Sequence, residues 1–226
     1  MGEGSKTNKC GIEEPINDFK EEKYMSRTTL RGRDFITWLD FTHEEIEGIL
    51  GTAHDLKRKQ IRREPHKLLD AKTLFMLFYN SSLRTRNSFE TGMTQLGGHA
   101  NFLQPGAVYT PVVKGKDIPY TTERVKDVAQ VLSEMGDGIA IRIYGEPTDW
   151  IYGKGNELIQ EFARWATIPV INMEDDMYHP CQALADIMTM QEKLGDLRKK
   201  KFVMSWAYSG SVKKPLAVPQ SAIISA

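Results

Sequence analysis

The sequence predicts an α/β domain with a parallel sheet flanked by helices, and three observations lead to this prediction. Short apolar runs alternate with segments of helical periodicity along residues 34–194. The runs are continuous, which is typical of strands buried on both faces of a parallel sheet. Polar and glycine-containing segments separate the runs. In a sheet of this kind, ligands bind beyond the carboxyl ends of the strands.

The composition is that of a globular protein and narrows the classes of function. The chain has 226 residues with 30 Lys+Arg and 30 Asp+Glu, so no basic excess indicates binding to nucleic acid or to an anionic membrane. No apolar run reaches the roughly 18 residues of a membrane span, and we expect no secretory signal. The two cysteines, Cys10 and Cys181, make no disulfide framework, so we expect a cytoplasmic protein. CxxC and HExxH are absent, so zinc chemistry has little support.

We expect three regions along the chain. Residues 1–27 are polar without a sustained apolar period, which predicts a mobile N-terminal extension. Residues 28–195 hold the alternating strands and helices of the first domain. Residues 196–226 hold one more apolar run and one incipient helix, and such a unit cannot bury both faces of its strand. We therefore expect this last region to be the start of a truncated second α/β domain.

Local patterns place the elements in order. Thr42 and Glu45 have the spacing of a capping box, which predicts a helix over about residues 43–60. The apolar runs predict strands at 74–79, 100–103, 138–143, 168–172 and 201–206. Helical periodicity predicts further helices at 84–96, 122–134, 156–165 and 182–194. Residues 104–121 are expected to form a long loop.

A dense group of hydroxyls and guanidiniums lies between the first expected strand and the helix that follows it, over residues 81–86. A helix N-terminus offers unpaired N–H groups and a positive dipole end, so this group predicts a phosphate site. Arg84 and Arg86 are two residues apart and point in different directions. One can therefore meet an anion while the other pairs within the protein. The alternative is a serine helix cap with ordinary surface arginines.

Two further groups follow other strands. His179 and Gln182 come after the strand at 168–172, and together they suit a small polar group such as an amide or carbamoyl. The alternative for His179 is a structural turn. Cys181 is either a nucleophile or a packed thiol, and we favour the packed thiol. Arg142, at the end of a buried strand, faces a ligand crevice or forms a buried ion pair, and the residues alone leave both open.

These motifs, in this order, resemble those of the aspartate/ornithine carbamoyltransferase family. Residues 82–86, Ser-Leu-Arg-Thr-Arg, resemble its Ser-x-Arg-Thr-Arg phosphate motif, and residues 179–182 look like its His-Pro-x-Gln motif. The strand ending at Arg142 is similar to the one that delivers the family's carbonyl-polarising arginine. Residues 89–92 and 95–100 look like the N-acetylornithine type. Residues 205–208 with 214–216 resemble the same knotted branch and also the YgeW-like carbamoyltransferases.

The resemblance implies a carbamoyl-phosphate-binding domain with a role for each matched residue. The residues implied to hold the phosphate are Ser82, Leu83 through its backbone, Arg84 and Thr85. The residues implied to be catalytic, by polarising the carbamoyl oxygen, are Thr85, Arg142 and His179. Gln182 would bind the carbamoyl amine, and Arg86 would support the loop.

The implied activity is transfer of the carbamoyl group of carbamoyl phosphate to the amine of an amino acid, an ornithine derivative or a related amine, with release of phosphate. The resemblance also implies a homotrimer, and no metal is required. Family members carry a second domain of comparable size that supplies most contacts to the acceptor. The alternative is therefore a truncated protein that binds carbamoyl phosphate or phosphate without turnover. A third possibility is a purely structural or oligomerisation module, in which the phosphate site stays empty.

Overall fold

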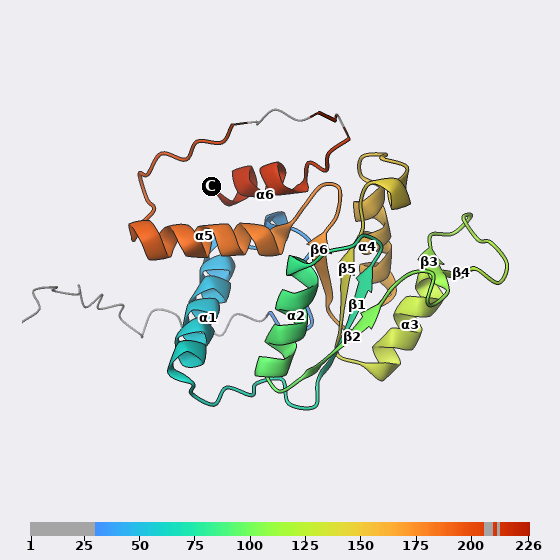
Figure 1. Cartoon of the computed structure of the whole chain (residues 1–226), viewed down its shortest axis with the longest axis horizontal. Helices are drawn as coiled ribbons and strands as arrows, with labels where there is room; N and C mark the ends of the chain where they lie inside the picture. The colour runs from blue at the N-terminus through green and yellow to red at the C-terminus, as the bar shows by residue number, and fades with distance from the viewer. Residues whose placement is uncertain (1–29, 206–209, 212) are drawn as a thin grey trace, which may run out of the picture.

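A computed structural model describes residues 30–205, 210–211 and 213–226; the N-terminal extension expected over residues 1–27 lies outside them. Figure 1 shows a central sheet with helices on both sides. The helices are α1 (His43–Arg62), α2 (Arg84–Gln95), α3 (Val125–Met135), α4 (Lys154–Trp165), α5 (Pro180–Leu194) and α6 (Ala217–Ser225), with short 3-10 turns η2 (Trp38–Asp40) and η3 (Glu146–Thr148). The strands are β1 (Thr73–Phe78), β2 (His99–Leu103), β3 (Thr110–Val112), β4 (Thr122–Arg124), β5 (Gly138–Arg142) and β6 (Val170–Glu174).

The central sheet has four parallel strands in the order β2-β1-β5-β6, which confirms the predicted fold class. Successive side chains of β1 point to opposite faces. Phe75 and Leu77 belong to a core formed with α3 and α4, whereas Leu74, Met76 and Phe78 belong to a core that includes α2. Both faces of the sheet are therefore covered, as the continuous apolar runs predicted.

The first helix begins as the sequence predicted. The Thr42 hydroxyl accepts a hydrogen bond from the Glu45 N–H at 3.2 Å, and the Glu45 carboxylate accepts one from the Thr42 N–H at 2.8 Å. The helix packs on α5 through a small core that includes Ile46, Leu50 and Ile187. None of the helices in the described part of the chain is long and apolar enough to cross a membrane.

The structure corrects two element predictions. Thr122–Arg124 is a strand that pairs with β3, not the first turn of a helix, and α3 begins only at Val125. The loop expected over 104–121 therefore contains a strand of its own. The strand expected at 201–206 is wrong over 201–205, where Phe202, Val203 and Met204 are 43%, 71% and 40% exposed. No described strand pairs with this run, and an apolar segment without a partner leaves its backbone groups to water.

The last helix lies beside α5 (Figure 1) and is tied to the loop that follows β6. Its Gln220 donates from Nε2 to the Met177 carbonyl at 3.2 Å and accepts at Oε1 from the Tyr152 hydroxyl at 2.7 Å. Ser221 accepts from the His179 backbone N–H at 2.8 Å. The helix thus contacts the segment that carries one of the predicted site residues.

Candidate active site

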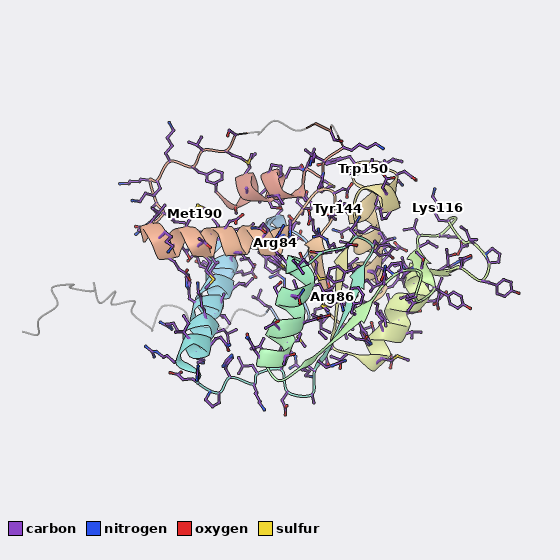
Figure 2. All side chains as sticks on the ribbon, viewed as in Figure 1. Arg84, Arg86, Lys116, Tyr144, Trp150 and Met190 are labelled. Atoms are coloured by element: carbon purple, nitrogen blue, oxygen red, sulfur yellow. The ribbon has the colours of Figure 1, made fainter. Side chains whose placement is uncertain are left out.

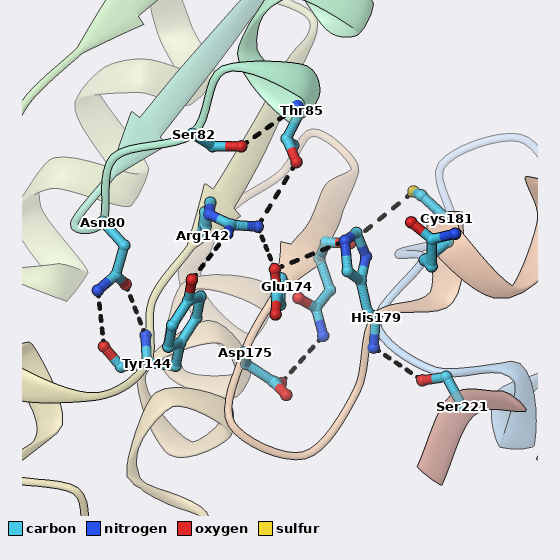
Figure 3. A network of polar contacts seen from close by, with 12 residues as sticks. Asn80, Ser82, Thr85, Arg142, Tyr144, Glu174, Asp175, His179, Cys181 and Ser221 are labelled. Carbon is cyan, nitrogen blue, oxygen red and sulfur yellow. Dashed lines mark hydrogen bonds and ion pairs between the residues drawn. The ribbon is translucent and has the colours of Figure 1, made fainter. Parts of the chain in front are cut away.

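The strand order places a crevice between the carboxyl ends of β1 and β5. In the sheet, β2 lies on one side of β1, and β5 and β6 lie on the other. The chain therefore leaves β1 and β5 in opposite directions across the sheet, which makes this point a topological switch point. Asn80 ties the two strand ends together. Its Nδ2 donates to the Tyr144 carbonyl at 2.8 Å, and its Oδ1 accepts from the Tyr144 N–H at 2.8 Å (Figure 3). The predicted site residues are arranged around this crevice.

The N-terminus of α2 is only partly capped. The Ser82 hydroxyl accepts from the Thr85 N–H at 3.2 Å, so Ser82 does cap the helix, as one reading of the sequence held. Its own O–H can still donate to an anion. Leu83, at the N-cap position, supplies no side-chain cap and is 77% exposed. The remaining N–H groups of a first helical turn have no intrahelical partner and are available to a ligand.

The two arginines of this segment have different surroundings, as their spacing predicted. Arg86 forms an ion pair with Glu90 at 2.9 Å, and its guanidinium lies 3.6 Å from the centre of the Phe102 ring. Arg84 is exposed at the start of α2 (Figure 2) and forms no ion pair or hydrogen bond within the described ranges. Arg86 is therefore structural, and Arg84 is the cation available to an anion.

The sequence left open whether Arg142 forms a buried ion pair or faces a ligand, and the structure is consistent with both. Its side chain is buried, and Nη1 donates to Glu174 on β6, the cross-strand neighbour of Arg142. The same nitrogen lies 3.5 Å from the Thr85 hydroxyl, and Nη2 donates to the Tyr144 hydroxyl at 2.8 Å. Its Nε is buried and has no hydrogen-bond partner among the described residues. Arg142 thus forms a buried ion pair and still lies against the start of α2.

Glu174 is a site residue that the sequence analysis missed. Its Oε2, which accepts from Arg142, also lies 3.6 Å from Nε2 of His179 (Figure 3). Burial raises the pKa of Glu174, and the Arg142 guanidinium opposes that shift. A run of three acidic residues begins at Glu174, the last residue of β6, at the ligand edge of the sheet. That run was the available indication.

His179 is buried and neutral at pH 7. Burial, together with the nearby Arg142, lowers the pKa of His179 to about 4. The ring Nδ1 is buried and has no hydrogen-bond partner in the part of the chain that the structure describes. An unpaired buried polar atom is costly, so this nitrogen is a natural contact for a polar ligand.

Gln182 and Cys181 begin α5 just beyond this histidine. Gln182 donates from Nε2 to Asp186 at 2.8 Å, and its carbonyl oxygen accepts no hydrogen bond from any described residue. That oxygen is available to an amine group. The Cys181 sulfur lies 3.8 Å from the Asn172 carbonyl, and burial raises the pKa of the thiol to about 12. A neutral, packed thiol is not a nucleophile, which supports the favoured reading.

The structure brings together part of the predicted set. Thr85 and His179 are linked through Arg142 and Glu174, and Ser82 contacts Thr85. The side chains of Leu83, Arg84 and Gln182 form no hydrogen bond or ion pair with the others, although the Gln182 backbone N–H donates to the His179 carbonyl at 3.1 Å. The arrangement combines cations, a helix N-terminus and neutral polar groups. It is therefore suited to a small ligand with an anionic end and a carbonyl or amide end. In the described residues no group of three or more His, Cys, Asp or Glu side chains could hold a metal ion.

Comparisons with known proteins identify the family of the chain. Residues 33–192 match the family described as "Aspartate/ornithine carbamoyltransferase, carbamoyl-P binding domain". The ornithine carbamoyltransferase of Halalkalibacterium halodurans is 46% identical over 181 residues, which cover 80% of this chain and 50% of that protein. The N-acetylornithine carbamoyltransferase of Xylella fastidiosa is 38% identical over 198 residues, covering 84% of this chain and 56% of that protein.

Solved structures show the same similarity. An N-acetyl-L-ornithine transcarbamylase variant complexed with carbamyl phosphate and N-succinyl-L-norvaline aligns with a TM-score of 0.76 at 36% identity, over 85% of this chain and 58% of that chain. The ornithine carbamoyltransferase from Pyrococcus furiosus aligns with a TM-score of 0.64 at 42% identity, over 74% of this chain and 48% of that one. The chain spans about half the length of the relatives it matches. It belongs to the aspartate/ornithine carbamoyltransferase family.

Proposed function

We propose that the protein transfers the carbamoyl group of carbamoyl phosphate to the amine of an amino acid and releases phosphate. The observation that carries the proposal is the pair of buried, unpaired nitrogens, Nε of Arg142 and Nδ1 of His179, at the crevice beside α2. The structure of a relative complexed with carbamyl phosphate supports it. No metal or cofactor takes part in the proposed reaction.

The phosphate end of the ligand binds at the start of α2. The first-turn N–H groups, including that of Leu83, and the Ser82 and Thr85 hydroxyls donate to its oxygens, and Arg84 supplies a positive charge. These groups belong to one short segment of the chain.

The carbamoyl end lies against Arg142, His179 and Thr85, and the Gln182 carbonyl accepts from the carbamoyl amine. The acceptor amine attacks the carbonyl carbon and forms a C–N bond, while the bond from that carbon to the phosphate oxygen breaks. Donors already in place stabilise the negative charge that develops on the carbonyl oxygen. The leaving phosphate takes the proton released by the amine, so no protein base is required.

The acceptor is an ornithine derivative or a related amine in this proposal, and its support is the named relatives, which are ornithine and N-acetylornithine carbamoyltransferases. Within the family we propose the knotted N-acetylornithine or YgeW-like branch. Leu83 supports this choice, because it stands where ornithine and aspartate enzymes have threonine and resembles the methionine of the N-acetylornithine type. The homotrimer and the cytoplasmic location also stay proposals.

A transfer assay tests the proposed activity. The purified chain is incubated with carbamoyl phosphate and, separately, with ornithine, N-acetylornithine and aspartate, and carbamoylated product and free phosphate are both measured. Product with one amine supports the proposal. Binding of carbamoyl phosphate without product favours the alternative, a binding protein without turnover. If the chain neither binds carbamoyl phosphate nor forms product, both the proposed transfer and the binding-only alternative are contradicted.

A further inference from the structure

The proposed reaction leaves the buried carboxylate of Asp175 without a role. This side chain is fully buried, and four N–H groups donate to it. Oδ2 accepts from Nδ2 of Asn172 at 2.9 Å and from Nδ2 of Asn156 at 2.8 Å. Oδ1 accepts from the backbone N–H of Met177 at 2.7 Å and from that of Tyr178. Asp175 therefore joins β6, the start of α4 and the loop that leads to α5.

The loop from Asp175 to Tyr178 is organised around this carboxylate. The Asp175 N–H donates to the Tyr178 carbonyl at 3.0 Å, which closes the loop on itself. The residue that follows the closed loop is His179. Figure 3 shows Asp175 below Glu174 and the His179 ring to the right of it. The position of the His179 imidazole therefore depends on the 175–178 loop, and most of the hydrogen bonds that fix this loop are accepted by the Asp175 side chain.

We propose that Asp175 is a positioning residue: its ionised carboxylate holds the loop in the form that places the His179 ring against Glu174 and Arg142. The inference rests on the proposed function, because the role of His179 in carbamoyl phosphate binding is part of that function. Asp175 itself does not touch the ligand.

The charge state of Asp175 gives this role a pH dependence. Burial, and to a smaller extent the neighbouring Asp176, raise the pKa of Asp175 to about 6, while the N–H donors act in the opposite direction. Protonation places a hydrogen on an oxygen that now accepts two N–H donors, so at least one hydrogen bond is lost. The hydrogen bonds that Asp175 accepts within the loop should therefore change as the pH falls through about 6.

Other titratable groups lie around Asp175. Glu174 precedes it and pairs with Arg142, and Asp176 follows it and accepts from the N–H groups of Gly153 and Asn156 at the start of α4. Burial, followed by Tyr178 and then by Asp176 and Asp175, raises the pKa of Tyr152. The pKa of His179 is lowered to about 4, so its own titration is separated from that of Asp175.

NMR of the histidine rings tests the inference without any ligand. The ring signal of His179 and the side-chain amide signal of Asn156 are followed from pH 4.5 to pH 8 in the wild-type chain. We expect one step with a common midpoint near 6 in both signals, because Asn156 reports on Asp175 directly. Absence of this shared step contradicts the inference, even if no variant folds.

The variant Asp175→Asn removes the charge and turns an N–H₂ group toward the amides of Asn156 or Asn172. We expect a folded protein with a shifted His179 ring signal, no step near pH 6, and carbamoyl phosphate binding weakened about tenfold at pH 7.5. The matched control is Asp196→Asn, at an exposed aspartate that pairs with Arg198, and it should change none of these readouts.

The double variant Asp175→Asn with Asn156→Asp restores one of the lost bonds, because the new amide can donate to the new carboxylate. We expect it to recover part of the His179 shift and part of the affinity. An unshifted His179 signal in folded Asp175→Asn, or a step near pH 6 that persists in it, overturns the inference. If the wild-type chain does not bind carbamoyl phosphate, the proposed function fails while the histidine signals still decide the role of Asp175.

Discussion

Oε2 of Glu174 lies 3.6 Å from Nε2 of His179, and the same oxygen accepts a hydrogen bond from Arg142. One carboxylate therefore connects the two side chains that are proposed to polarise the carbamoyl oxygen. It also compensates the charge of Arg142 while no ligand is bound. A bound anion would also compensate this charge. Ligand binding is therefore coupled to the stability of the buried Arg142–Glu174 pair.

The variant Glu174→Gln tests this coupling. Removal of one partner of a buried ion pair leaves the other charge uncompensated, so we expect the free energy of unfolding to fall by about 3–5 kcal/mol. Carbamoyl phosphate should restore part of this loss, because its carbamoyl oxygen would accept from Arg142 and its phosphate charge would lie at the start of α2, which Arg142 also contacts. Urea unfolding with and without ligand measures both effects. The control Glu157→Gln breaks an exposed pair with Lys154 and should cost at most about 1 kcal/mol. Equal stabilisation of wild type and Glu174→Gln by the ligand would contradict the coupling.

The variant Arg84→Ala tests the phosphate assignment. Arg84 is exposed and has no partner among the described residues, so its loss should leave the fold and the melting temperature unchanged. We expect carbamoyl phosphate binding to be lost, because a charge-assisted contact to the phosphate is removed. Calorimetry measures the affinity, and Arg58→Ala, at an exposed arginine on α1, is the control. Wild-type affinity in Arg84→Ala would show that the phosphate binds elsewhere.

His179→Asn separates the two ends of the ligand. Asparagine keeps a residue suited to the N-cap of α5 but cannot reach as far as the imidazole. We expect binding of carbamoyl phosphate to weaken about tenfold or more, while binding of inorganic phosphate changes little, because His179 contacts only the carbamoyl end. Parallel titrations with the two ligands measure the difference. Equal losses for both would assign His179 to the phosphate end.

Gly155 tests the packing of α4 against the site. A Cβ at this position would lie 2.4 Å from the Ile143 carbonyl oxygen and 2.8 Å from a carboxylate oxygen of Asp176. We expect Gly155→Ala to lower the free energy of unfolding by about 1–3 kcal/mol, because rigid backbone must move. The control Gly92→Ala, within α2, meets nothing within 4 Å and should stabilise the chain by up to about 1 kcal/mol. Thermal melting compares them; a similar effect of both would contradict the close approach.

Local patterns predicted the features that depend on neighbours in the chain. The capping box at Thr42 and Glu45 is one, and the different surroundings of Arg84 and Arg86 are another. The parallel sheet also followed, because a strand buried on both faces must be apolar along its whole length. In each case the physical cause is contained in a few consecutive residues.

Features that depend on distant pairing were missed. The strand expected to end at Asn172 continues to Glu174, because Glu174 pairs with Arg142 across a register shift in β5. From the sequence alone, a polar residue after an apolar run is taken as the end of the strand, because its cross-strand partner is not known. The opposite error occurred at 201–205, where apolar residues have no described strand beside them. The role of Glu174 could be seen only once β5 and β6 were placed side by side.

Calorimetric titration of the wild-type chain with carbamoyl phosphate, and with inorganic phosphate as the comparison, tests the central claim most directly. The site has separate contacts for the phosphate and carbamoyl ends, so carbamoyl phosphate should bind more tightly than phosphate, and the two should compete. Equal affinity for both ligands, or no binding of carbamoyl phosphate, would contradict a carbamoyl phosphate site built from α2, Arg142 and His179.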